Sequence, residues 1–286
     1  WPTLKLLRDS ASFPAGSAIL AERGEDQAFV HLWRPTASKA LSLLQERCEP
    51  LSSVLKIAND AWLDMTEALL NRLCSTAEQA LWELFSQRRT PGQMLLAHLR
   101  GTGSRSGEKA NESYKRFVEE ILQSSYDLLL AEYPVLGRLL AIVIHHWIES
   151  SQEMLSRIAR SRPILDDRFH ISKRASLTGI QMELSDPHRC GRTVATLQFN
   201  IEGETMRVVY KPKNMQVDEA YQQFVAALNK SSELPPLRVL TIVDRGDYGF
   251  MEWVEHQQCN SESRLRSFYN NAGRTTAILH ALGCSD

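Results

Sequence analysis

The sequence predicts an α+β protein in which a mainly helical N-terminal region is followed by an antiparallel sheet with a helix. Apolar residues recur at helical spacing over much of residues 37–147, whereas short runs rich in β-branched and aromatic residues follow after residue 166. Hydrophobic residues occupy 43% of the 286 positions, which is enough for a sizeable buried core. We therefore predict two parts, residues 1–165 and residues 166–286.

Composition and charge exclude some classes of function. The chain carries 33 Lys and Arg against 34 Asp and Glu, so it lacks the basic excess of a dedicated nucleic-acid-binding protein. No apolar run reaches the length of a transmembrane helix, and no signal-peptide pattern is present. The five cysteines have no zinc-ligand spacing, so we expect reduced thiols and no metal site in a cytoplasmic protein. Attachment to a membrane through an exporter complex is left open.

Helix starts are predicted at three places in the N-terminal part. Capping boxes at residues 75–78 and 90–93 indicate two of them. The Tyr-Pro pair at 133–134 indicates the third, which opens the clearest helix of the sequence. The apolar stripe of that helix consists of Leu136, Leu139, Leu140, Val143, Ile144 and Trp147. The adjacent histidines at 145–146 point in different directions around the helix, so we do not interpret them as a metal-binding pair.

Two segments are predicted as connections between elements. Pro163, Asp166 and Asp167 indicate a linker where the helical pattern ends. The glycine-rich residues 101–109 superficially resemble a phosphate-binding loop, but they lack the Gly-Lys-Ser/Thr ending and do not follow a predicted strand. We interpret them as a surface loop.

A strand pair with a polar loop before it is the feature that points to a function. Alternating apolar residues predict strands at 194–199 and 206–210, joined by a turn at 202–204. The polar loop 186–192 opens the first strand, and Lys211 closes the second. A strand-borne lysine beneath a loop that covers phosphates is how protein kinases hold ATP, because the strand fixes where the charge points. A solvated charge at the edge of the strand is the competing interpretation.

The C-terminal segment predicts further helices and strands. The expected elements are a helix at 217–228, strands at 237–243 and 248–254, a turn at 245–247 and a final helix at 268–282. Asp218 is the expected N-cap of the first helix, and Gly283 is the expected C-terminal cap of the last. This order of elements resembles the small lobe of a kinase with the entry to its large lobe. In that arrangement, backbone groups at Glu252 and Val254 in the hinge would receive the adenine of ATP.

Five segments carry a more specific resemblance. They include Asp-Pro-His-Arg-Cys-Gly-Arg at 186–192, Val-Tyr-Lys-Pro-Lys at 209–213 and Asp-Arg-Gly-Asp-Tyr-Gly-Phe-Met-Glu-Trp-Val at 244–254, with further matches at 133–140 and 273–286. In order and spacing, these segments resemble the dehydratase domain of class II (LanM-type) lanthipeptide synthetases. The resemblance covers the chain from about residue 117 to its end, and it is less specific in the helical N-terminal part.

This resemblance implies a lipid-kinase-like fold that modifies a ribosomal precursor peptide. Such enzymes phosphorylate serine and threonine side chains with ATP and Mg²⁺, and then eliminate phosphate to leave dehydroalanine or dehydrobutyrine. The implied partners are the precursor peptide, with its leader and core, and the remaining C-terminal part of the synthetase. Zinc is expected only in a separate cyclase domain, which nothing in this chain matches.

The resemblance also implies roles for individual residues. Lys211 matches the lysine that holds ATP phosphates. Asp186 and His188 match a loop implicated in the phosphate chemistry, where the histidine would steer phosphate or shuttle a proton; a turn-capping aspartate and a solvated histidine are the alternative. Arg192 would clamp phosphate bidentately, with a salt-bridged strand arginine as an equal alternative. Asp286 matches the first residue of an Asp-x-His-x-x-Asn catalytic segment and would orient or deprotonate the substrate hydroxyl.

The sequence departs from the family pattern by stopping at Asp286. The histidine and asparagine of the catalytic segment do not follow, and neither do the magnesium-binding aspartate and the arginine and threonine linked to elimination. The predicted lobe is therefore truncated before its catalytic loop, and we expect residues 1–286 alone to be inactive in dehydration. A non-catalytic peptide-binding scaffold, or a degenerate kinase relative, is the alternative function. The joint presence of Lys211, His188 and Asp286 favours the enzyme.

Overall fold

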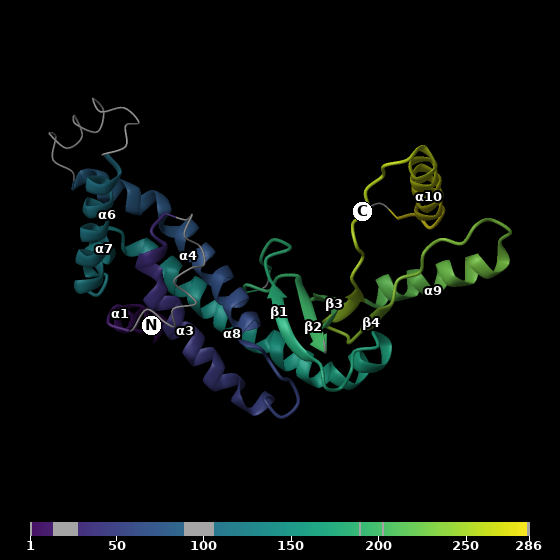
Figure 1. Cartoon of the computed structure of the whole chain (residues 1–286), viewed down its shortest axis with the longest axis horizontal. Coiled ribbons are helices and arrows are strands. Elements are labelled where there is room, and N and C mark those ends of the chain that lie inside the picture. The colour runs from purple at the N-terminus through teal and green to yellow at the C-terminus, as the bar shows by residue number, and fades with distance from the viewer. Residues whose placement is uncertain (1, 14–27, 89–105, 189, 202, 285–286) are drawn as a thin grey trace. The chain divides into compact units, whose positions relative to one another are not determined.

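Helices form the N-terminal part of the chain and antiparallel strands follow them, in agreement with the predicted α+β class (Figure 1). Figure 1 shows a computed structural model that describes residues 2–13, 28–88, 106–188, 190–201 and 203–284. The chain divides into two compact units, Trp1–Pro212 and Lys213–Asp286. The boundary predicted between residues 165 and 166 stays a prediction. Among the described residues, no helix is both long and apolar enough to cross a membrane.

The first unit is organised around a long helix, α8, which contacts α1, α3, α4 and α7. The helices described in this unit are α1 (Pro2–Ser10), α3 (Val30–Cys48), the 3₁₀ helix η1 (Glu49–Leu51), α4 (Asn59–Gln87), α6 (Ser106–Gln123), α7 (Asp127–Glu132) and α8 (Pro134–Arg168). The start of α8 at Pro134 confirms the prediction, since proline is well suited to a first helical position. Of the predicted stripe, Leu136, Leu140, Ile144 and Trp147 are buried, whereas Leu139 is 46% exposed.

Buried polar contacts fix how these helices meet. The indole Nε1 of Trp147 in α8 donates a hydrogen bond to the Met65 carbonyl of α4 at 3.0 Å. The Trp33 ring of α3 stacks on Tyr126 with centroids 5.4 Å apart, and the Tyr126 hydroxyl donates to the Leu32 carbonyl at 2.9 Å. Burial raises the pKa of Tyr126 to about 12, so this hydroxyl keeps its proton at neutral pH. The Trp147 indole and the Tyr126 hydroxyl therefore each have a defined acceptor on another helix, which favours one arrangement of these helices.

The predicted linker around Pro163 is wrong, because α8 continues through it to Arg168. A proline inside a helix removes one backbone hydrogen bond and crowds the preceding turn. Tertiary contacts of the neighbouring Arg162 offset this cost. Its guanidinium donates to the Ser172 and Ala175 carbonyls at 2.7 and 3.1 Å and pairs with Asp166 at 2.7 Å. The end of the helix is therefore tied to the segment that follows it.

The helix start predicted at residues 75–78 is also wrong. Helix α4 runs without a break from Asn59 to Gln87, and the Ser75 hydroxyl donates to the Arg72 carbonyl inside it. A serine in mid-helix bonds back to an earlier carbonyl in this way when no free amides are present for it to cap. The second capping box, at residues 90–93, lies outside the described residues, as do residues 101–105 of the predicted glycine-rich loop. The rest of that loop, residues 106–109, lies in α6 and not in a surface loop.

Three antiparallel strands complete the first unit: β1 (Ser176–Gln181), β2 (Ala195–Ile201) and β3 (Glu204–Lys211). The β2 and β3 pair confirms the two strands predicted from alternation, with Leu197 opposite Val208 and both fully buried. Strand β1 was not predicted. It is anchored to the segment before α4 by the Leu177 amide, which donates to the Lys56 carbonyl at 2.8 Å.

The second unit contains α9 (Gln216–Ser231), β4 (Ile242–Asp244), β5 (Gly249–Glu252) and α10 (Glu262–Ala281). The predicted turn at 245–247 is present, with Gly246 at φ +86°. The two strands are shorter than predicted. Before β4, the amides of Leu237 and Leu240 bond to side chains of α9 and not to a strand, with Asn229 and Gln222 as acceptors. The backbone there is therefore satisfied without a sheet.

Both helices of the second unit begin earlier than predicted. The N-cap position of α9 is Met215, whose amide donates to the Asp244 carboxylate at 2.7 Å. The predicted cap, Asp218, instead lies in the first turn and pairs with Lys213 at 3.2 Å. Helix α10 begins at Glu262 and not at residue 268, because Ser261 caps it by accepting the Arg264 amide. Gly283, at φ +69°, follows its end as predicted.

Gly249 of β5 should not tolerate a side chain. A Cβ atom there would lie 2.8 Å from the Val243 carbonyl oxygen and against the Met215 side chain. Backbone cannot move away easily, so we expect Gly249→Ala to destabilise the protein by about 1–3 kcal/mol. Gly273→Ala is the matched control, because a Cβ in this exposed part of α10 meets nothing within 4 Å. We expect it to raise the free energy of unfolding by up to about 1 kcal/mol. Thermal unfolding followed by circular dichroism measures both, and equal midpoints for the two variants would contradict this packing.

Candidate functional site

The loop that carries Asp186 and His188 is closed by its own backbone. His188 and Arg192 exchange two hydrogen bonds, each N–H donating to the other residue's carbonyl at 2.9 Å. The ends of the loop are tied by the Ser185 hydroxyl, which accepts the Val194 amide at 3.1 Å. The side chains of Asp186 and His188 are exposed, and within the described part of the chain they form no hydrogen bond or ion pair. The loop therefore presents a carboxylate and an imidazole to solvent from a fixed base.

Gly191 lets this loop lie directly on α8. It is buried, its φ is +90°, and a Cβ atom there would lie 2.9 Å from the Cβ of His146. Only glycine meets both requirements, the positive φ and the close approach. Burial lowers the pKa of His146, and electrostatic interactions with His145 and Arg72 lower it further.

An ion pair to α4 holds the segment just before the loop. Arg72 pairs with Glu183 at 2.8 Å. Burial raises the pKa of Glu183, and the Arg72 charge opposes that rise. The segment before the loop is therefore held by α4, while the loop itself lies on α8.

A network of four side chains connects the loop to the sheet through α8. Glu153 of α8 receives Arg192 bidentately, from Nε at 2.6 Å and Nη2 at 2.8 Å. The same carboxylate pairs with Arg157, one helical turn later, at 3.0 Å. Arg157 is buried and donates from Nη1 to the Tyr210 hydroxyl of β3 at 2.9 Å. Of the two interpretations of Arg192, the salt-bridged arginine is therefore the one found in this structure.

The strand register sets the position of Lys211. Ala195, the first residue of β2, lies opposite Tyr210, and Lys211 is the last residue of β3. The lysine therefore lies at the same end of the sheet as the loop 186–192, which leads into β2. Successive side chains of a strand project from opposite faces of the sheet. Tyr210 projects toward α8, so the Lys211 side chain projects from the other face. Within the described residues, its ammonium group forms no ion pair or hydrogen bond.

The residues predicted for the hinge lie in the second unit. The Glu252 amide donates to the Thr241 carbonyl at 3.0 Å, and its carboxylate accepts the Thr241 amide and Arg238, both at 2.7 Å. Burial acts to raise the pKa of Glu252, but these hydrogen bonds outweigh it and lower the pKa below its ordinary value. Val254 is exposed just after β5. Asp286 lies outside the described residues.

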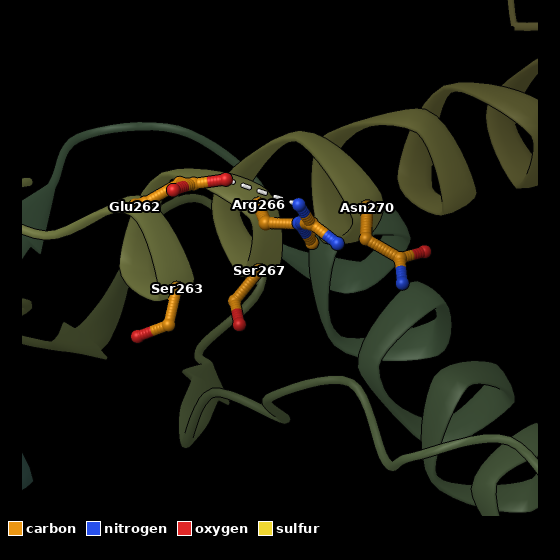
Figure 2. Close-up of a pocket in the computed structure, with 5 residues that line it drawn as sticks. All are labelled: Glu262, Ser263, Arg266, Ser267 and Asn270. Atoms are coloured by element: carbon orange, nitrogen blue, oxygen red, sulfur yellow. Dashed lines mark hydrogen bonds and ion pairs between the residues drawn. The ribbon is translucent and has the colours of Figure 1, made fainter.

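Two surface hollows contain none of the predicted site residues. One, of about 610 Å³, lies on α10. Figure 2 shows that Arg266 and Glu262, which line it, are paired, and the distance between their charged atoms is 3.1 Å. This is an exposed pair within one helix, which contributes little energy. The other, of about 480 Å³, lies between α1, α3 and α8 and is mainly apolar. In the described parts of the chain, no group of three or more His, Cys, Asp or Glu side chains is arranged to hold a metal ion.

Comparison with known proteins places the chain in a family. Residues 133–286, more than half of the chain, match the family described as a domain of unknown function, DUF4135. The chain belongs to the DUF4135 family. It is also 20% identical over 190 residues to the lacticin 481/lactococcin biosynthesis protein LcnDR2 of Lactococcus lactis subsp. lactis. That alignment covers 63% of this chain and 20% of the relative, so the chain spans about a fifth of that protein's length. The two matches confirm the resemblance to class II lanthipeptide synthetases.

The DUF4135 match includes α8, the loop and β3, and so contains all four residues of the network. The sequence analysis singled out Arg192 but passed over its partner Glu153 and also Arg157, which pairs with the same carboxylate. The four-residue spacing of Glu153 and Arg157 on a helix was the available signal, since such pairs meet on one helical face. It does not by itself indicate the Arg192 and Tyr210 contacts, which arise from chain segments far away in the sequence.

Proposed function

We propose that this chain is the ATP-binding part of a lanthipeptide dehydratase, which phosphorylates serine and threonine residues of a precursor peptide and then eliminates phosphate. The name of the Lactococcus relative supports a role in lantibiotic biosynthesis, and the DUF4135 match supports the same family of enzymes. The kinase-like character of the lobe, the use of ATP and Mg²⁺, and the two chemical steps are part of the proposal.

The placement of Lys211 is the observation that carries the proposal. A lysine without a partner among the described residues ends a strand whose register brings it to the same end of the sheet as a polar loop. The neighbouring Lys213 has a carboxylate partner, Asp218, and so provides an internal contrast. A cation on a fixed strand suits phosphate oxygens because the strand limits where the charge goes. Lys211 would therefore hold the phosphates of ATP.

The loop supplies the groups expected to act on phosphate. His188 is exposed next to the paired Arg192 backbone, which fixes its Cα position while leaving the imidazole accessible. Asp186 lies two residues earlier and is also exposed. An imidazole there would steer the phosphate or move a proton, and the carboxylate would orient it.

Arg192 has a different role in this proposal from a phosphate clamp. Its Nε and Nη2 atoms are both engaged by Glu153, which leaves one edge of the guanidinium unused by this contact. A bidentate grip on phosphate through the same two atoms would require the ion pair to break. We therefore assign Arg192 to holding the loop on α8.

The proposed reaction has two steps. When bound, ATP supplies the transferable phosphoryl group, and Mg²⁺ neutralises charge on its phosphates. In the first step, the peptide hydroxyl oxygen forms a bond to phosphorus as its proton passes to a base, and ADP leaves. In the second step, the α-proton is removed, the Cβ–O bond to phosphate breaks, and a carbon–carbon double bond remains. Lys211 and the loop act on the phosphate in these steps, and no described residue is assigned to the metal.

Replacing Lys211 tests the ATP assignment. Lys211→Ala removes one charge-assisted contact to phosphate, worth about 1.5–3 kcal/mol. We expect phosphorylation of the precursor peptide by the whole encoded protein to fall about 10- to 100-fold. Mass spectrometry of the peptide after incubation with ATP and Mg²⁺ measures this. Lys213→Ala is the matched control and should leave the rate nearly unchanged. An unchanged rate in Lys211→Ala would rule out this assignment.

Replacing His188 tests the role of the loop. We expect His188→Ala to lower formation of dehydrated peptide by roughly 100-fold, the usual contribution of a positioned proton-transfer group. Accumulation of phosphorylated peptide would assign the histidine to elimination, and accumulation of unmodified peptide would assign it to phosphoryl transfer. His145→Ala, on the exposed side of α8, is the control. Normal dehydration by His188→Ala would reject both roles.

A further inference from the structure

We propose that Glu153 is the positioning residue that couples the loop 186–192 to the strand that carries Lys211. This inference rests on the proposed function, because it concerns the alignment of two parts of the same site. It does not follow from the sequence motif, since Glu153 lies on α8, outside the segments that carry the proposed chemistry.

One carboxylate serves both connections. Its Oε1 atom receives Arg192 Nη2 at 2.8 Å and Arg157 Nη2 at 3.0 Å, while Oε2 receives Arg192 Nε at 2.6 Å. Arg192 closes the loop through its backbone contacts with His188. Arg157 continues the connection to the Tyr210 hydroxyl at 2.9 Å. The loop, through Arg192, and the strand, through Arg157 and Tyr210, are thus both connected to the same Glu153 carboxylate.

Burial makes this arrangement demanding. Arg157 is 2% exposed, and removing a carboxylate that pairs with a buried charge is destabilising. Tyr210 is 3% exposed, so its hydroxyl has little access to water as a substitute for Arg157. Burial raises the pKa of Tyr210, opposed by the Arg157 hydrogen bond and charge, so the hydroxyl stays protonated. Loss of the Glu153 charge should therefore disturb Arg157 and, through it, the end of β3.

The effect on Lys211 follows from strand geometry. Tyr210 and Lys211 are adjacent and leave opposite faces of β3, so anchoring one side chain on α8 fixes the backbone from which the other projects. A misplacement of about 1 Å in a catalytic arrangement costs roughly 100-fold in rate. A residue that holds the strand and the loop together should therefore influence catalysis without touching the substrate.

Helix α8 contains a matched control. Glu149 lies one turn before Glu153 and also pairs with an arginine, Arg47, at 2.6 Å. That pair is largely exposed, with the Glu149 side chain 49% accessible, and the contacts of Arg47 lead to α8 itself and not to the loop or β3. Glu149→Gln removes the same charge from the same helix, and it should leave the proposed site undisturbed.

The first experiment measures positioning without catalysis. Hydrogen exchange of the whole encoded protein is followed at the amides of residues 188–192 and 209–211 in wild type, Glu153→Gln and Glu149→Gln. We expect Glu153→Gln to accelerate exchange about 10-fold or more in both segments, and Glu149→Gln to change neither. Acceleration in only one segment, or the same profile in both variants, would overturn the coupling. Because this readout needs no ATP, an inactive wild-type enzyme would reject the proposed function and leave this test intact.

The second experiment uses activity and a milder variant. Tyr210→Phe removes only the hydroxyl that Arg157 bonds, and it keeps the ring that fills the core. We expect Glu153→Gln and Tyr210→Phe each to lower kcat for peptide phosphorylation about 10- to 100-fold, with a double variant little worse than the more severe single one. Independent, multiplicative effects would overturn the inference. If Glu153→Gln does not fold, the Tyr210→Phe variant alone provides the test. Faster hydrogen exchange at the distant residues 188–192 in this variant would support the coupling. An unchanged exchange rate at those residues would overturn it.

Discussion

The contact on which the candidate site depends is the ion pair that Glu153 shares between Arg157 and Arg192. A buried guanidinium is costly unless a carboxylate and a hydrogen-bond acceptor satisfy it, and Glu153 and Tyr210 meet these two needs for Arg157. The same carboxylate also receives Arg192. The residue that compensates the buried charge of Arg157 therefore also positions the polar loop. The position of the loop on α8 and the position of the end of β3 therefore both depend on the Glu153 carboxylate.

Local sequence rules predicted the elements whose pattern is carried by neighbouring residues. Alternation located β2 and β3, and the Tyr-Pro pair located the start of α8. The same rules failed at Pro163, where Arg162 supplies contacts to Ser172 and Ala175 that outweigh the local cost of proline. They also missed β1, which is fixed by long-range bonds to residues before α4. Tertiary contacts overrode local propensity in both cases.

The candidate site shows the same division between local and distant information. Lys211, Asp186 and His188 were predicted because each lies in a short contiguous segment, 209–213 or 186–192. The register of β2 and β3 brings the lysine to the loop's end of the sheet. The role of Arg192 was left between two alternatives, because its partner lies 39 residues away on a helix. In this structure the Arg192 guanidinium donates two hydrogen bonds to the Glu153 carboxylate. The hinge residues Glu252 and Val254 and the catalytic aspartate Asp286 remain predictions from the resemblance.

The most direct test of the central claim, that Lys211 faces the phosphates of ATP, is chemical labelling. An acyl-phosphate derivative of ATP transfers its acyl group to a lysine amine that lies beside the bound phosphates, and peptide mass spectrometry identifies the labelled residue. The account predicts that Lys211 is labelled, that excess ATP prevents the labelling, and that Lys213, paired with Asp218, is labelled far less. Equal labelling of Lys211 and Lys213 that ATP does not reduce would contradict it.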